Sequence, residues 1–194
     1  QGAPDLRRGL RVGQRWPVRW VPIDQPLLGH TPGTHDQGGV VGQGLAVGGS
    51  RFIRLEGCLE RTDGIWFTST SGGDQAGGQV WRFDPRESVL ELMFEVTDRN
   101  QLDYPDNIAE GPGAGMVICG DSMIRKQQEL SWLGRDGRLL TLARNNTRIK
   151  GVDYRSAEWA GCCVSADGRW LFANIYSPGF TVAITGPWDD LLIA

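Results

Sequence analysis

The feature that most constrains the fold is a unit of about 50 residues, built from paired apolar runs, that recurs after residue 50. Each unit starts with a carboxylate, continues through a short apolar run and a turn containing glycine, and ends in a second apolar run. The leading carboxylates are Glu56, Asp106 and Glu158, which are 50 and then 52 residues apart. This repeat predicts three copies of one structural unit.

Further pairs of apolar runs lie between the leading carboxylates, at 79–84 with 89–94 and at 129–133 with 138–142. The last pair is joined across Asp136-Gly137, which is a hairpin signal because glycine accepts the positive φ that such turns need. Two hairpins give four strands, and a four-stranded unit at this period is typical of a β-propeller blade. We therefore predict an all-β fold, a β-propeller with about three four-stranded blades.

The first fifty residues lack the repeat. Prolines at 17 and 22 allow the aromatic run 16–23 to form no more than an edge strand, and residues 26–49 are rich in glycine without a pattern. With 28 Gly and 10 Pro in 194 residues, many turns are expected throughout the chain. We expect residues 1–50 to form an extended Gly/Pro-rich segment and residues 51–194 to form a partial propeller domain.

The predicted number of blades is too small for a closed propeller. Propellers close with 4–8 blades, and three blades would leave two exposed sheet edges and an uncovered core. The chain is therefore expected to be half of a six-bladed propeller. Another polypeptide or a second copy of the chain would close it.

Composition excludes several classes of function. The net charge of −3 gives no reason to expect nucleic acid as a partner, and no apolar run reaches the length of a transmembrane segment, about 20 residues. The glycine clusters precede no Gly-Lys-Ser/Thr sequence, so a phosphate-binding loop is not predicted. Ser69 and Ser71 have no histidine nearby, which argues against a serine hydrolase triad.

The four cysteines have no Cys-x-x-Cys spacing, and most of them lie in apolar runs. We expect buried, inert thiols rather than a disulfide framework. These residues are Cys58, Cys119, Cys162 and Cys163. Histidine is restricted to His30 and His35, so any metal would be held mainly by carboxylates.

Arg54 and Glu56 form the first candidate for a functional pair. Residues two apart on a strand point to one face, so the two side chains would project together from the apolar run 52–58. An ion pair that braces the strand and a pair that belongs to a site are equally compatible with this pattern. In a propeller, Glu56 would face Asp106 and Glu158 at one end of the central channel, although each carboxylate taken alone also suits a solvated turn.

An ordered series of motifs between residues 16 and 188 resembles the C-terminal half of the PhoX-type alkaline phosphatases of bacteria. The motifs are 51–58 (RFIRLEGC), 67–73 (FTSTSGG), 78–85 (GQVWRFDP), 105–107 (PDN), 143–146 (ARNN), 158–161 (EWAG), 165–168 (SADG) and 183–188 (AITGPW).

The resemblance implies a propeller that carries iron and calcium and hydrolyses phosphate monoesters in the periplasm or outside the cell. It implies that Arg54 holds the phosphate and that Glu56 is a metal ligand. It assigns Asp106, Asp121 and Glu158 to the metal as well, and Asn107 to a supporting position. Carboxylate oxygens suit hard cations, and a planar guanidinium suits phosphate.

The chain also departs from the family pattern. Gly120 stands where the family usually has the first residue of an acidic dipeptide, and nothing in residues 1–50 resembles the Cys and Glu ligands of the family's N-terminal half. Two functions therefore remain open. The first is a metal-dependent phosphomonoester hydrolase of which this chain is half, and the second is a non-catalytic propeller remnant that acts as a structural or interaction subunit.

Overall fold

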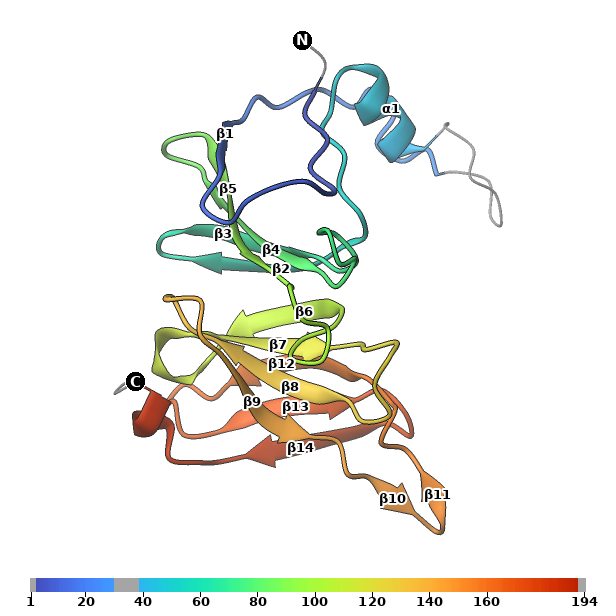
Figure 1. Cartoon of the computed structure of the whole chain (residues 1–194), viewed down its shortest axis with the longest axis vertical. Helices are drawn as coiled ribbons and strands as arrows, with labels where there is room; N and C mark the ends of the chain where they lie inside the picture. The colour runs from blue at the N-terminus through green and yellow to red at the C-terminus, as the bar shows by residue number, and fades with distance from the viewer. Residues whose placement is uncertain (1–2, 30–38, 192–194) are drawn as a thin grey trace.

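The computed structural model describes residues 3–29 and 39–191, and the all-β prediction is confirmed. The strands of this part form three larger antiparallel sheets and a small hairpin (Figure 1). The first sheet has the order β1-β5-β4-β3-β2, the second β6-β7-β8-β9 and the third β12-β13-β14. Apart from β1, every strand of these sheets pairs with its neighbour in sequence.

The strand bounds are as follows. The first sheet contains β1 (Arg15–Pro17), β2 (Leu55–Arg61), β3 (Gly64–Ser69), β4 (Gln79–Asp84) and β5 (Val89–Glu95). The second contains β6 (Pro105–Glu110), β7 (Met116–Gly120), β8 (Glu129–Leu133) and β9 (Leu139–Arg144). The third contains β12 (Trp159–Val164), β13 (Leu171–Ile175) and β14 (Phe180–Ile184). The hairpin is β10 (Arg148–Ile149) with β11 (Val152–Asp153).

The hairpins predicted at 79–94 and 129–142 are confirmed as β4–β5 and β8–β9. Only the second sheet has the predicted four strands within the described residues. The first gains β1, which pairs with β5 through Trp16 and Leu90 as the edge strand that the prolines allow. The third has three strands.

The prediction of an unstructured stretch over residues 26–49 is wrong in part, because α1 (Val40–Ala46) forms there. Two glycines inside this short helix lower its intrinsic propensity, so the residue pattern does not predict it. Gln43 fastens it to the preceding segment, since its side chain accepts from the Gln25 amide (3.0 Å) and donates to the Gln25 carbonyl (3.1 Å). The short 3-10 helices are η1 (Pro112–Ala114) and η2 (Trp188–Leu191).

The three sheets stack face to face, from the first near the N-terminus to the third near the C-terminus (Figure 1). Because successive side chains of a strand point to opposite faces, one sheet contributes side chains to two cores. On β4, Val80 packs into the core shared with the second sheet, and Trp81 packs into a core on the opposite face with Leu6 and Phe83. On β7, Ile118 joins the first of these cores, whereas the neighbouring side chain of Cys119 joins the core shared with the third sheet.

The end strands of the three sheets lie side by side along one edge of this stack, because β6 contacts both β2 and β12. The Gly57 amide donates to Thr68 Oγ1 (2.9 Å), and that hydroxyl donates to the Asp106 carbonyl (2.8 Å). The Gly161 amide donates to Asn107 Oδ1 (2.8 Å). These bonds join β2, β6 and β12 side by side. No helix in the described ranges is long and apolar enough to cross a membrane.

Candidate functional site

Each of the three end strands β2, β6 and β12 carries a β-bulge near its first residue. The register shifts between Leu55 and Cys58 on β2, between Pro105 and Ile108 on β6, and between Ala160 and Cys162 on β12. A bulge adds a residue to one strand of a pair, bends that strand and re-aims the side chains beside it. The repeated bulges therefore shape the edge of the stack where the candidate residues lie.

The strand pairing corrects the predicted register of the carboxylates. Leu55, Pro105 and Trp159 make the first pair of their sheets, with Ser69, Gly120 and Ile175 as partners in that order. Glu56 and Asp106 follow directly and are equivalent. The third residue of that register is Ala160.

Glu158 instead precedes the first pair, in the register of Arg54 and Tyr104. The backbone hydrogen bonds support this register, because these three residues each accept one bond from the neighbouring strand or turn. The carbonyls of Arg54, Tyr104 and Glu158 accept from the amides of Thr70 (2.9 Å), Asp121 (3.0 Å) and Tyr176 (3.0 Å), respectively. The prediction that Glu56, Asp106 and Glu158 share one register is wrong for Glu158. The cause is the longer path from Pro105 to Trp159, which contains the hairpin β10–β11.

The structure nevertheless brings the predicted site residues together. Arg54 Nη2 lies 3.3 Å from Glu56 Oε1, with 44% of the arginine side chain exposed. Burial raises the pKa of Asp106, and the negative charges of Glu56 and Asp121 raise it further while Arg54 opposes them. These four residues therefore share one electrostatic environment with Glu158.

Glu158, which directly precedes the third sheet, belongs to the same cluster of charges. Burial raises its pKa, the charge of Asp121 and a hydrogen bond with that residue add to the effect, and Asp106 contributes as well. Arg54 again acts in the opposite direction. Carboxylates that raise one another's pKa values are poorly compensated as ions, so this cluster attracts positive charge.

Asp106 and its neighbour Asn107 have different environments. Asp106 Oδ1 is buried without a hydrogen-bond partner in the described structure. A buried acceptor without a donor is costly, and a cation can compensate it. Asn107 instead turns its side-chain oxygen to the bulge on β12, where it accepts from the Gly161 amide. It therefore contacts the third sheet.

The donors fit a hard cation in chemistry and fall short in number. Carboxylate oxygens are the ligands that calcium and iron(III) prefer. Yet within residues 3–29 and 39–191, no three His, Cys, Asp or Glu side chains are grouped closely enough to hold one ion. His30 and His35 lie outside the described residues. A cation held here would need donors in addition to these carboxylates.

Tyr104 is the residue that sequence reasoning missed. Its ring lies between two guanidinium groups, with Arg54 at 5.4 Å and Arg99 at 5.2 Å from the ring centroid. Arg99 in turn pairs with Asp103, whose side chain is fully buried. Alignment of the repeats on the Pro105 register, rather than on the carboxylates, would have placed Tyr104 opposite Arg54.

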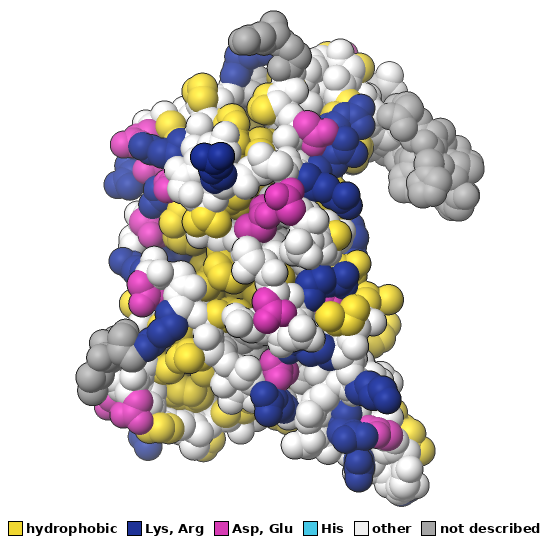
Figure 2. Space-filling model, in the orientation of Figure 1, with side chains coloured by type: hydrophobic (Ala, Val, Ile, Leu, Met, Phe, Trp, Pro, Cys, Tyr) yellow, Lys and Arg dark blue, Asp and Glu magenta, His cyan; other side chains and the backbone are white. Residues whose placement is uncertain are grey.

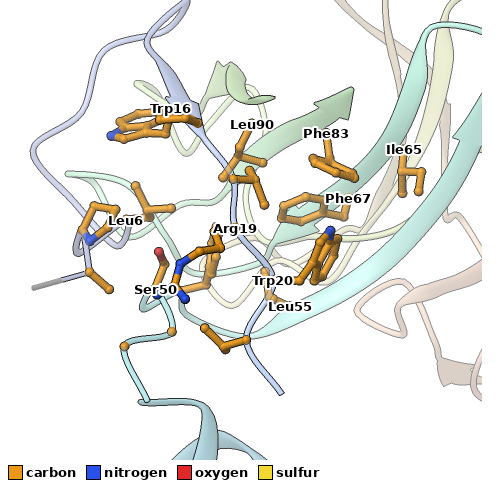
Figure 3. A pocket seen from close by; sticks show the side chains of 18 of the residues that line it. Leu6, Trp16, Arg19, Trp20, Ser50, Leu55, Ile65, Phe67, Phe83 and Leu90 are labelled. Atoms are coloured by element: carbon orange, nitrogen blue, oxygen red, sulfur yellow. The ribbon is translucent and has the colours of Figure 1, made fainter. Parts of the chain in front are cut away.

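A large apolar cavity of about 980 Å³ lies on the face of the first sheet that points away from the second sheet. Figure 3 shows Trp16 and Trp20 of the N-terminal segment opposite Phe67 and Phe83 of the sheet. The Trp20 and Phe83 rings meet edge to face at 5.5 Å. Glu56 also lines this cavity, so the cavity reaches the strand that carries the candidate site.

The charged side chains on the face drawn in Figure 2 are mixed in sign and separated by exposed hydrophobic residues. No single basic region dominates this view. The arrangement agrees with the small net charge of the chain.

Comparisons with known proteins identify the family. A family model described as alkaline phosphatase PhoX matches residues 8–179. A search of curated proteins finds no significant match. Among solved structures, the chain is similar to a catalytically inactive virginiamycin B lyase from Staphylococcus aureus, crystallised with quinupristin, at 15% identity and a TM-score of 0.40. The similarity covers 69% of this chain and 41% of the lyase chain. Because the PhoX model spans most of its length, the chain belongs to the PhoX family of alkaline phosphatases.

Proposed function

We propose that the chain supplies one part of a metal-dependent phosphomonoester hydrolase. Arg54 binds the phosphate, and the carboxylates of Glu56, Asp106, Asp121 and Glu158 hold cations. The observation that carries the proposal is the convergence of these residues around a buried carboxylate oxygen that has no donor. Family membership favours phosphate esters as substrates.

Arg54 suits a phosphate because its guanidinium presents several N–H donors in one plane. Glu56 holds the guanidinium from one side and the Tyr104 ring lies against one of its faces, while much of the side chain remains exposed. The arginine is thus oriented without being buried. It can bind two phosphoryl oxygens and stabilise the charge that develops on them.

The four carboxylates require cations for this role, because a phosphate dianion would otherwise be repelled. Iron and calcium, which the family resemblance implies, would neutralise the cluster and polarise the phosphoryl oxygens when bound. Within the chain, Asp106 would contribute its unpartnered oxygen, and Asp121 and Glu158 would contribute carboxylate oxygens. Asn107 would hold β6 against β12 while this happens.

The proposed architecture is half of a six-bladed propeller, with each of the three sheets as one blade. The face-to-face stacking and the contacts of the end strands β2, β6 and β12 along one edge support it. The two outermost faces support it as well: the first sheet bears the apolar cavity, and the third exposes Trp170 and Phe172. Another polypeptide or a second copy would cover these faces and supply the remaining donors, in the periplasm or outside the cell.

The experiment is a phosphatase assay with a chromogenic phosphate monoester, after the chain is refolded with iron and calcium and its metal content is measured. Arg54→Ala should raise the inhibition constant of inorganic phosphate roughly 10- to 150-fold, the range of a charge-assisted hydrogen bond. Arg15→Ala is the matched control, because Arg15 is exposed and pairs with Glu87 away from the site. A chain that retains no metal and shows no turnover contradicts the proposal.

The second candidate, a non-catalytic propeller remnant that acts as a structural or interaction subunit, is favoured by one observation. In the described residues, the donors are not grouped closely enough to hold an ion. Calcium titration by calorimetry separates the two candidates. The subunit function predicts no binding in the presence of the closing partner, whereas the enzyme predicts binding that depends on Asp106.

A further inference from the structure

Two thiols from different sheets meet beside the candidate site. Cys119 lies on β7 and is fully buried, whereas Cys162 lies on β12 and is partly exposed. Both belong to the core between the second and third sheets. Because β7 contacts β12, the two side chains pack into this core from neighbouring strands.

The bulge on β12 determines which of two adjacent cysteines makes this contact. In a regular strand, residue 162 would point away from the face on which Trp159 packs. The extra residue at Gly161, which has φ of +60°, reverses this alternation, so Trp159, Cys162 and Val164 all pack on the core shared with β7. Cys163 is thereby turned to the opposite face and is exposed.

The bulge is itself held by the second sheet, because Asn107 accepts from the Gly161 amide. The position of Cys162 is therefore fixed relative to both β6 and β7. The expectation that all four cysteines are buried is wrong for Cys58 and Cys163, which are exposed. That division leaves one pair in the core, of which Cys119 is fully buried and Cys162 is partly exposed, and two separate surface thiols.

We propose that Cys119 and Cys162 are an oxidisable dithiol, which a small-molecule disulfide converts into a disulfide bond that ties the second sheet to the third. Cys162 reacts first because part of its side chain is accessible, whereas Cys119 has no exposed surface. This inference does not depend on the proposed phosphatase activity.

The exchange is balanced by the small-molecule disulfide. Cys162, after loss of its proton, attacks one sulfur of the reagent, forms a mixed disulfide and releases one small thiolate, which takes up that proton. Cys119 then loses its proton, attacks the Cys162 sulfur and displaces the second small thiolate, which is protonated in turn. The two protein thiols are oxidised by two electrons, and the reagent is reduced to two thiols.

The bond would close a loop of the chain that contains the hairpin β10–β11 and would restrict the unfolded state. It would also pin β7, which ends beside Asp121, against β12, which begins beside Glu158. Oxidation would therefore hold both carboxylates in the arrangement described.

The test uses the full chain with Cys58→Ser and Cys163→Ser, which leaves only the proposed pair. After incubation with oxidised glutathione, peptide mapping should find Cys119 linked to Cys162, with a mass loss of two hydrogens and no glutathione adduct. Unfolding in denaturant should then reveal no reactive thiol. The melting temperature should rise by roughly 5–10 °C, and a reductant should reverse the change.

The matched control carries Cys58→Ser and Cys162→Ser, so that Cys163 replaces Cys162 as the partner available on β12. It should acquire glutathione on Cys163 and keep Cys119 reduced, since the two side chains lie on opposite faces. If either variant fails to fold, the same peptide mapping is made on the unaltered chain. A stable glutathione adduct on Cys162 with Cys119 still reduced, or linkage of Cys119 to Cys163, overturns the proposal.

Discussion

The guanidinium of Arg54 lies over the ring of Tyr104, with 5.4 Å between its central carbon and the ring centroid. The two residues occupy the same register of neighbouring sheets, and both adopt left-handed backbone conformations, with φ of 51° and 53°. Bulky residues rarely adopt such values unless their surroundings impose them. The Tyr104 amide donates to the Gly77 carbonyl at 2.8 Å, which holds the ring in place beneath Arg54.

Replacement of Tyr104 should weaken phosphate binding through Arg54. A cation–π contact at an exposed site contributes about 0.5–1 kcal/mol, so Tyr104→Leu should raise KM about 2- to 5-fold with little change in kcat. Tyr104→Phe retains the ring and should behave like the unaltered protein. Steady-state kinetics with a phosphate monoester measure both constants. A loss in Tyr104→Phe as large as that in Tyr104→Leu would assign the effect to the hydroxyl group instead.

The carboxylate cluster should make the metal-free chain less stable as the pH rises. The pKa of Asp106 in the folded chain is raised above its usual value of 3.8 and that of Glu158 above 4.5, chiefly by burial. The folded state therefore binds these protons more tightly than the unfolded state, and this stabilisation is lost as the pH rises through the folded pKa values. Asp106→Asn should reduce that loss.

Urea unfolding with a chelator at several pH values between 4 and 7 measures this effect. Carboxylates paired with arginine change the stability in the opposite direction as the pH rises. Burial raises the pKa of Glu129, but hydrogen bonds from Arg144 and Arg125 outweigh it and lower the pKa. The informative quantity is therefore the difference between the unaltered chain and Asp106→Asn. The prediction fails if this difference does not change with pH. Calcium at pH 7 should stabilise the unaltered chain more than the variant.

Gly57 should tolerate no side chain, because the backbone of β6 lies directly against it. A Cβ at this position would lie 2.4 Å from the Asp106 carbonyl oxygen and 2.8 Å from the Ile108 nitrogen. Both contacts are with backbone, which cannot move aside easily. We expect Gly57→Ala to lower the free energy of unfolding by about 1–3 kcal/mol, as overpacking does.

Gly29→Ala is the control for this prediction, because a Cβ there would meet nothing within 4 Å. Denaturant unfolding of both variants gives the comparison. Equal stability of the two would contradict the close approach of β2 and β6.

The sequence predicted the strands well because their information is local. The hairpin β8–β9, for example, is predicted by the apolar runs on either side of Asp136-Gly137. The repeat indicated that separate units would bring their first strands together. The proximity of Arg54, Glu56 and Asp106 followed from that repeat. These inferences required only periodicity and turn chemistry.

Register within the repeat was not predictable from the same information. A carboxylate at position 158 resembles one at position 106 in sequence, but strand pairing places Glu158 with Arg54 and Tyr104. The deciding factor is the hairpin inserted after β9, which does not alter the apolar pattern. The helix α1 was not predicted, because the glycines inside it lower the helix propensity of the segment.

Asn107 provides a direct test of whether the bulge on β12 is held by the second sheet. Its side-chain oxygen is the acceptor for the Gly161 amide at 2.8 Å, so Asn107→Ala leaves that donor without its partner. The loss of a partly buried hydrogen bond of this kind should lower the free energy of unfolding by about 1–2 kcal/mol. Asn107→Asp keeps an acceptor but places a fifth carboxylate in the cluster, so it should be stable only at low pH or with cations.

Asn100→Ala is the matched control, because the Asn100 side chain is exposed and its amide donates only to neighbouring Asp98. Urea unfolding gives the stabilities, and hydrogen exchange at the Gly161 amide gives the local effect. Exchange there should quicken in Asn107→Ala and remain unchanged in Asn100→Ala. Unchanged exchange in both variants would mean that the bulge is fixed by the third sheet alone, and Asn107 would then have no supporting role for the position of Cys162.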